Sequence, residues 1–202
     1  MPQYFDNNPS LASKIRSVYL EINGEKLEFL TDNGVFSKSH IDDGSLAFLK
    51  VILPLQLSGK ILDLGAGYGT IGLTVAYFCP RAYVDLAEIN ERALSLSKKN
   101  ACALHVSQRV AFLQSDVYSN IEGTYDSIVV NPPIRAGKKV TYSMYEGALQ
   151  HLNDGGSLYI VIRKNQGAIS ASNYIKELFS NVTLLKKDKG YYIYKATKVT
   201  KK

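Results

Sequence analysis

The sequence contains few of the residues that build disulfide frameworks, metal centres or membrane spans. Its 202 residues include two cysteines, Cys79 and Cys102, which are too few for a disulfide framework and fit reduced thiols in the cytosol. The three histidines are scattered, with no cysteine or carboxylate at ligand spacing, which argues against a metal site. No apolar run approaches the roughly 18 residues of a membrane-spanning helix, and the N-terminus lacks a signal-peptide pattern. We therefore expect a cytoplasmic protein that binds neither metal nor membrane.

The positive charge of the chain is confined to its end. The formal net charge is +6, yet residues 1–179 contain 17 basic and 17 acidic side chains. Residues 180–202 contain seven lysines and one acid, Asp188. A basic tail can bind phosphates through counterion release, or it can keep a protein soluble. Charge alone leaves both interpretations open.

Strands alternate with helices over most of the chain, which predicts βαβ units and a mainly parallel sheet with helices on both faces. Strands are expected at 60–64, 82–88, 110–114, 127–130 and 157–163. Helices are expected at 71–78, 91–104, 145–152 and 171–179, and a final hairpin at 182–186 and 191–196. The hairpin would add an antiparallel edge to the sheet. This core should occupy residues 59–202.

The first 58 residues are expected to pack on the core as a small hairpin and helix, giving one compact domain. Asn23-Gly24 is a favoured two-residue hairpin turn, because both positions tolerate positive φ. Asp42 or Asp43 could cap the helix that follows, and Pro54 should end or kink it.

A glycine-rich turn follows the first core strand and predicts a nucleotide-like ligand. The chain has no Walker loop and no G-x-S-x-G motif. Gly67–Gly72 matches the dinucleotide pattern G-x-G-x-x-G, whereas Asp63–Gly69 matches D-x-G-x-G-x-G, a turn of methyl donors. Asp63, just before the turn, suits a cationic ligand better than a phosphate. Glu88, at the tip of the second strand, could accept hydrogen bonds from both ribose hydroxyls in either case.

The fourth core strand runs into Asn131-Pro132-Pro133-Ile134, which favours transfer to an amine. The prolines stiffen the backbone, so that the Asn131 side-chain carbonyl and a backbone carbonyl could accept both hydrogens of one planar amino group. The nitrogen lone pair would then point at an incoming methyl group, which is catalysis by positioning. A dehydrogenase has no use for such a motif.

Together these motifs resemble the class I S-adenosylmethionine-dependent N-methyltransferases. The strings Gly34–Lys38, Asp43–Ser45, Asn131–Lys138 and Leu152–Gly156 are similar to the methyltransferase small domain family, which includes the catalytic half of the ribosomal small-subunit RNA guanine-N2 methyltransferase. The likeness covers about Tyr19 to Lys195. It implies a Rossmann-like seven-stranded sheet with an antiparallel last strand, S-adenosylmethionine as cofactor, and an exocyclic amine of an RNA base as target.

The resemblance also implies roles for individual residues. Asp63, Gly65, Ala66 and Gly67 would surround the methionine part of the donor, with Glu88 on the ribose. Adenine would be framed by Ile89, Asp116 and Val117. Asn131 and Pro132 would hold the target amine beside the donor. Substrate would be bound by Phe36, Lys38, Pro133, Ile134, Arg135 and Lys138.

One departure from the family bears on the substrate. Relatives that modify adenine or glutamine carry an aromatic residue after the two prolines, whereas this chain has Ile134. Ile134 therefore favours the guanine-N2 branch and ribosomal RNA. A protein-glutamine or small-amine methyltransferase and a non-catalytic RNA-binding module are the alternatives. The final hairpin should lie at one sheet edge, displaced from the donor turn, so we expect the tail to add salt-dependent RNA affinity without selecting the base.

Overall fold

The computed structural model describes residues 11–200 and contains a seven-stranded sheet in the order β5-β4-β3-β6-β7-β9-β8. Its strands are β3 (Gly59–Leu64), β4 (Ala82–Glu88), β5 (Val110–Gln114), β6 (Tyr125–Val130), β7 (Leu152–Arg163), β8 (Thr183–Asp188) and β9 (Tyr191–Thr197). The first five are parallel, and β9 is antiparallel to both its neighbours. This confirms the predicted Rossmann-like sheet with an antiparallel last strand.

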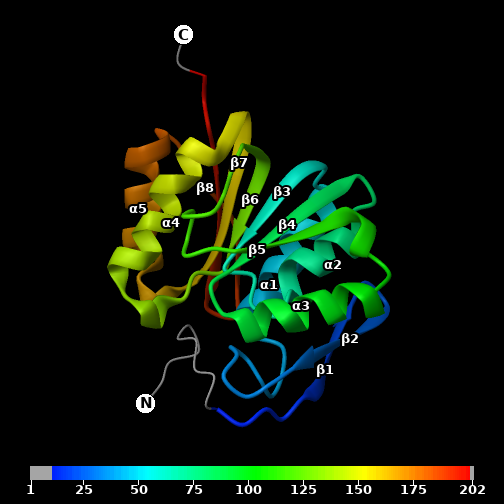
Figure 1. Ribbon diagram of the computed structural model, residues 1–202. Coiled ribbons are helices and arrows are strands. Elements are labelled where there is room, and N and C mark those ends of the chain that lie inside the picture. The colour runs from blue at the N-terminus through cyan, green and yellow to red at the C-terminus, as the bar shows by residue number, and fades with distance from the viewer. Residues whose placement is uncertain (1–10, 201–202) are drawn as a thin grey trace.

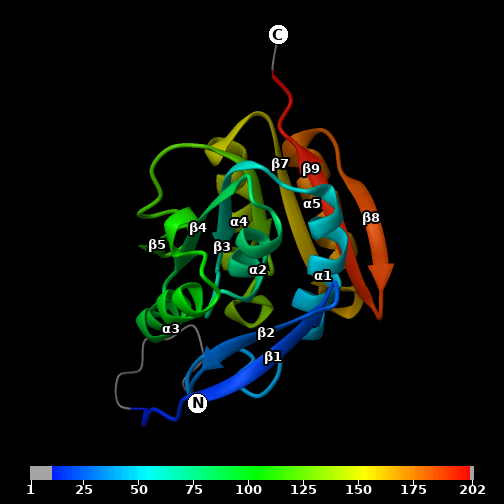
Figure 2. The same ribbon diagram turned by 90° about the vertical axis from the view of Figure 1, so that its right-hand side faces the viewer.

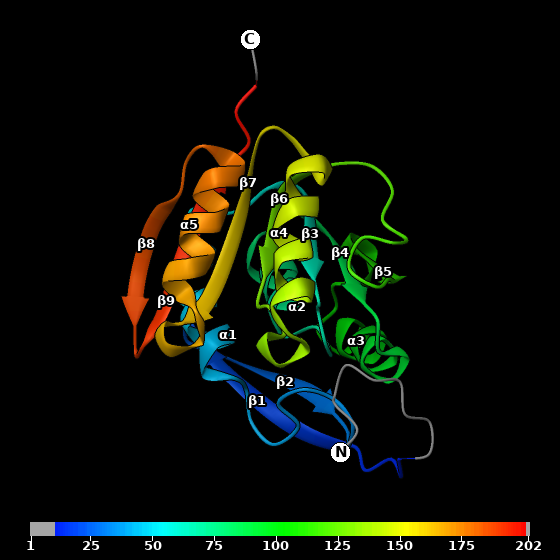
Figure 3. The ribbon, with the colours of Figure 1, turned by 90° about the vertical axis from the view of Figure 1, so that its left-hand side faces the viewer.

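Helices cover both faces of the sheet (Figure 1). They are α1 (Asp43–Ile52), α2 (Thr70–Phe78), α3 (Glu91–Ala103), α4 (Lys138–His151) and α5 (Ala168–Phe179). The first three pack on one face with one hydrophobic cluster, and α4 and α5 pack on the other with a second (Figure 3). Because β3, β6 and β7 lie between two cores, these strands are apolar on both faces, as buried parallel strands are.

A separate two-stranded sheet precedes the core (Figure 2). It joins β1 (Arg16–Ile22) to β2 (Glu25–Thr31) through the predicted Asn23-Gly24 turn, in which both residues have positive φ. Its apolar face joins the same cluster as α1, α2 and α3. The side chain of Asn100 on α3 bonds both the N–H and the C=O of Leu30, at 2.7 and 3.0 Å. Helix and hairpin are thereby tied together.

Two elements differ from the sequence prediction. Helix α4 begins at Lys138, seven residues before the expected start, and its first residues, Lys138 and Lys139, are exposed and give no apolar signal. Strand β7 begins at Leu152, five residues before the expected start at 157, and so includes Asp154–Gly156. There Lys198 bonds Gly155 and Gly156 through its backbone, and a partner that lies so far along the chain leaves no local signal.

The register of β9 decides what lies near the carboxyl ends of the parallel strands. Tyr191, its first residue, pairs with Arg163, the last residue of β7. The turn between β8 and β9 therefore lies on the same side of the sheet as the carboxyl ends of the parallel strands, where ligands of α/β sheets bind. The other end of β9, from which the chain continues to Thr200, lies at the opposite edge (Figure 2). In the part of the chain that the structure describes, no helix is both long and apolar enough to span a bilayer.

Candidate active site

The glycine turn connects β3 to α2 through backbone conformations that side chains disfavour. Gly65, Gly67 and Gly69 all have positive φ, of 77°, 57° and 95°. Gly69 is the N-cap of α2 and offers no side chain to the free N–H groups of the first helical turn. Asp63 takes over that function, because its Oδ2 accepts a hydrogen bond from Gly72 N at 2.7 Å.

Asp63 lies beneath the turn and is 1% exposed. Burial raises its pKa to about 7, opposed by the Gly72 hydrogen bond and supported by the nearby charge of Glu88. A Cβ on Gly72 would come within 2.8 Å of the Asp63 carboxylate, so this helical glycine permits the close approach. Asp63 braces the turn from below, and its side chain does not reach the pocket described next.

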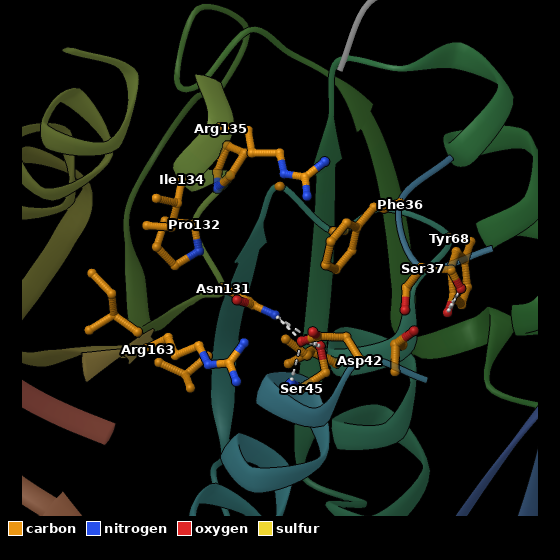
Figure 4. A pocket seen from close by; sticks show the side chains of 18 of the residues that line it. Phe36, Ser37, Asp42, Ser45, Tyr68, Asn131, Pro132, Ile134, Arg135 and Arg163 are labelled. Carbon is orange, nitrogen blue, oxygen red and sulfur yellow. Dashed lines mark hydrogen bonds between the residues drawn. The ribbon is translucent and has the colours of Figure 1, made fainter. Parts of the chain in front are cut away.

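A pocket enclosing about 260 Å³ opens at the carboxyl ends of β3, β6 and β7 (Figure 4). Ten of the predicted site residues line it: Phe36, Gly65, Ala66, Gly67, Glu88, Asn131, Pro132, Pro133, Ile134 and Arg135. The sheet thus brings the glycine turn, the acid after β4 and the Asn-Pro-Pro motif after β6 into one cavity.

Glu88 ends β4 and is 9% exposed, with its carboxylate directed at the turn. Oε2 accepts from Gly67 N at 2.7 Å and Oε1 from Asn90 N at 2.8 Å. Burial raises its pKa, while these backbone hydrogen bonds lower it. A carboxylate has about four acceptor sites, so Glu88 can position the turn and still accept hydrogen bonds from a ligand.

Asn131 is fixed by the N-terminus of α1, from more than eighty residues away. Its Nδ2 donates to Asp42 Oδ2 and to Ser45 Oγ, both at 3.0 Å (Figure 4). A carboxylate can only accept, so the atom that faces Asp42 must be the amide nitrogen. The opposite atom, Oδ1, accepts no hydrogen bond within residues 11–200, and the residue lines the pocket. The result is an oriented acceptor.

Of the two predicted caps, Asp42 is the N-cap of α1, and the structure gives it a second function. Its Oδ2 accepts from Ser45 N at 2.8 Å, which is the capping bond. The same oxygen holds Asn131. The Asn-Pro-Pro segment contributes its own rigidity, because Pro132 O accepts from Ile134 N at 2.9 Å at the start of the short helix η3 (Ile134–Ala136).

Six predicted residues do not line this pocket: Lys38, Asp63, Ile89, Asp116, Val117 and Lys138. Lys38 and Lys138 are exposed near its rim. Asp116 is exposed beyond the end of β5, next to β4, and Val117 packs at the margin of the α4–α5 core. Within residues 11–200, no three His, Cys, Asp or Glu side chains gather as a metal site would require.

Sequence reasoning missed several residues of the pocket wall: Asp42, Ser45, Tyr68, Arg163 and Tyr191. Arg163 ends β7, so the rule that ligands bind at carboxyl ends of strands would have found it. The Tyr191 ring packs on Gly44 of α1, where a Cβ would approach it to 2.8 Å. No local signal indicates Tyr191, because its place depends on the register of β9.

Comparison with known proteins agrees with this arrangement. The family model "Methyltransferase small domain" matches residues 26–195. The uncharacterized protein YbxB of Bacillus subtilis is 41% identical over 97% of this chain and 98% of its own length. Ribosomal RNA small subunit methyltransferase C of Vibrio vulnificus is 35% identical over 93% of this chain and 54% of its own length.

A solved structure is similar in fold and in sequence. The T. thermophilus 16S rRNA N2 methyltransferase RsmC, in complex with AdoMet and guanosine, superposes with a TM-score of 0.81 at 28% identity. The match covers 94% of this chain and 52% of RsmC. The chain therefore spans about half the length of the named rRNA methyltransferases that it matches. On the family model and these relatives together, the chain belongs to the methyltransferase small domain family.

Proposed function

We propose that this protein transfers a methyl group from S-adenosylmethionine to the exocyclic N2 amine of a guanine in ribosomal RNA. The observation that carries the proposal is the orientation of Asn131. Its amide nitrogen is engaged by Asp42 and Ser45, its oxygen accepts no hydrogen bond within residues 11–200, and the residue lines the pocket together with the glycine turn. Support for RNA and for guanine comes from Ile134 and from the relatives that act on rRNA.

The pocket suits S-adenosylmethionine on one side. The turn at Gly65–Gly67 brings bare backbone close to a ligand, and a Cβ on Gly67 would meet nothing within 4 Å, so the space above it is open. Glu88 accepts three backbone hydrogen bonds and has an acceptor site left for a ribose hydroxyl, and its carboxylate would attract a cation. Ile89, Asp116 and Val117 follow β4 and β5 and would frame the adenine. When bound, the donor supplies an electrophilic methyl group.

The residues of the chain then have to position the amine. Asn131 Oδ1 would accept one amine hydrogen, and the second lone pair of Pro132 O, which already accepts from Ile134, would accept the other. Both acceptors are fixed before substrate arrives, so little reorganisation is needed as charge develops on the nitrogen. Phe36 faces Pro132 and Ile134 across the pocket and could cover the base (Figure 4). Arg135 and Lys138, with Lys38 opposite, would contact phosphates.

The test combines donor binding with methyl transfer. We expect calorimetry to detect binding of S-adenosylmethionine, and labelled methyl to enter unmodified ribosomal RNA as N2-methylguanosine. Asn131→Ala should reduce transfer at least a hundredfold, about 2.7 kcal/mol of transition-state stabilisation, and leave donor binding within a few-fold. Asn153→Ala, at the opposite edge of the sheet, is the matched control.

Three results would contradict the proposal. Label that enters protein and never RNA would indicate a protein-glutamine methyltransferase. Tight RNA binding without donor affinity would indicate a non-catalytic module. If Asn131→Ala transfers methyl groups at the wild-type rate, Asn131 is not a catalytic residue.

A further inference from the structure

The turn between β8 and β9 lies next to the pocket, although the hairpin is displaced sideways from the glycine turn by two intervening strands. Arg163 at the end of β7 pairs with Tyr191, and Lys164 N donates to Gly190 O at 2.8 Å. Lys187 pairs with Tyr192, one residue from the edge. Lys189 lies in the turn itself. Lys187 and Lys189, two of the seven lysines among residues 180–202, therefore lie on the side of the sheet where the pocket opens.

The cations along this edge are exposed and lack acidic partners. They are Arg135, Arg163, Lys164, Lys187 and Lys189, and we call them the basic rim. The three salt bridges found within residues 11–200 use Lys26, Lys60 and Arg92, and none uses a rim cation.

Two rim cations contact tyrosine rings. Arg163 lies over Tyr191 and Lys187 over Tyr192, with 5.6 and 4.9 Å to the ring centroids. These contacts restrict the side chains without using up their charge.

Acidic groups occur on both halves of this end of the sheet, so the two halves differ mainly in their cations. Glu88, Glu91 and Asp116 follow β4 and β5, on the donor side. On the rim side the acids are Asp188, the last residue of β8, and Asp42 and Asp43, which lie near Tyr191. On the rim side the five cations outnumber the three acids, so this half attracts a polyanion.

We propose that the RNA strand carrying the target base leaves the pocket across the ends of β7, β9 and β8, with its phosphates on the basic rim. This rests on the proposed function, which supplies RNA as substrate. From β6 to β8 the rim crosses three strand spacings, about 15 Å, enough for several phosphates. An acidic protein segment would also match the charge. RNA is the better match because one strand carries both the repeated phosphates for the rim and the base amine for the acceptor in the pocket.

The experiment compares two pairs of exposed lysines. Lys187→Ala/Lys189→Ala removes rim cations, and Lys98→Ala/Lys99→Ala removes the same charge from the exposed surface of α3. The probe is a fluorescein-labelled RNA hairpin with a single-stranded loop, titrated at several KCl concentrations. Each lost phosphate contact lowers the slope of log K against log salt by about 0.7 for a single strand. For the rim variant, the magnitude of the slope of log K against log salt should fall by about 1.4, and the KM for RNA should rise. Its Kd for S-adenosylmethionine and its melting temperature should equal those of wild type.

Three outcomes separate the possibilities. If the rim variant equals the α3 variant in salt slope and KM while wild type methylates RNA, the rim does not bind the RNA, and the proposed function still holds. Wild type that binds RNA through the rim but never methylates it supports the rim and overturns the function. Polyglutamate that binds wild type as tightly as RNA, with the same loss in the rim variant, assigns the surface to an acidic protein and overturns the proposal.

Discussion

Asn131 illustrates how one residue depends on others that are remote in sequence. An asparagine amide can point either way, and its two orientations present opposite hydrogen-bonding groups to a substrate. Asp42 and Ser45 permit only the orientation in which Nδ2 faces them and Oδ1 is left as the available acceptor. Under the proposed function, the α1 cap would act on the reaction without contacting the substrate amine, and Asp42 and Ser45 would be positioning residues.

Ser45→Ala tests this orientation with little risk to the fold. The variant removes one of the two acceptors of Asn131 Nδ2, while the backbone N–H of residue 45 still caps on Asp42. One hydrogen bond contributes about 1 kcal/mol, so kcat should fall about five- to tenfold with the donor Kd unchanged. Single-turnover methyl transfer and calorimetry measure the two quantities.

Two further variants make the Ser45 result specific. Ser95→Ala, on the exposed face of α3, is the matched control and should behave as wild type. Asn131→Asp would place a carboxylate against Asp42, and like-charge repulsion should cost more than Ser45→Ala does. If Ser45→Ala keeps the wild-type kcat but binds S-adenosylmethionine more weakly, Ser45 contributes to donor binding and does not orient Asn131.

At the scale of elements, the start of α2 combines a glycine N-cap with a buried carboxylate. Asp63 supplies the capping acceptor that Gly69 lacks, but burial raises its pKa to about 7. Between pH 4 and pH 7 the unfolded chain releases this proton while the folded protein retains it. The folded state therefore binds more protons, and the free energy of unfolding must fall as pH rises through this window.

Asp63→Asn should remove that loss of stability and retain an acceptor for Gly72 N. Relative to wild type, the free energy of unfolding of the variant should increase from pH 4 to pH 7 and level off above, with a total gain of at most about 4 kcal/mol. Urea unfolding at a series of pH values measures the difference. Exposed Asp154→Asn is the control and should follow the wild-type curve. A difference between Asp63→Asn and wild type that is constant from pH 4 to pH 8 would mean that Asp63 ionises normally.

Local sequence patterns predicted the elements and motifs. The features that they did not predict depend on contacts between segments far apart in the chain. The Asn23-Gly24 turn, the α1 cap and the strands at each motif follow from residues within one element. The partner of Asn131 and the place of Tyr191 depend on how segments far apart in the chain meet. The charge of residues 180–202 looked like a single tail, yet the antiparallel register of β9 directs its two ends to opposite edges of the sheet.

At the scale of the whole molecule, the division into residues 1–58 and 59–202 within one compact domain is still a prediction. Two observations favour a single cooperative unit. The hairpin shares its hydrophobic cluster with α2 and α3. In addition, Asn100, which is fully buried, bonds the backbone of Leu30 twice and Tyr68 O at 2.9 Å, so one side chain joins the hairpin, α3 and the glycine turn.

Asn100→Ala should weaken this junction without dividing the molecule. Three backbone groups would lose their partner, which costs about 3–5 kcal/mol when they stay buried, or a fall in Tm on the order of 10 °C for a chain of this size. Calorimetry should show one transition at the lower temperature. Hydrogen exchange should accelerate at the amides of β1 and β2 more than at those of β9.

Asn181→Ala is a closely matched control, because Asn181 makes the same kind of triple backbone contact at another junction. It bonds Thr197 N and Thr197 O, at 2.9 and 2.8 Å, and also Phe179 O, so it ties the end of α5 to β9. Its loss should lower Tm too, but the faster exchange should then appear at β9 and spare the hairpin. If Asn100→Ala instead gave two separate transitions, the hairpin and the core would be independent folding units, because cooperative unfolding requires that neither part is stable without the other.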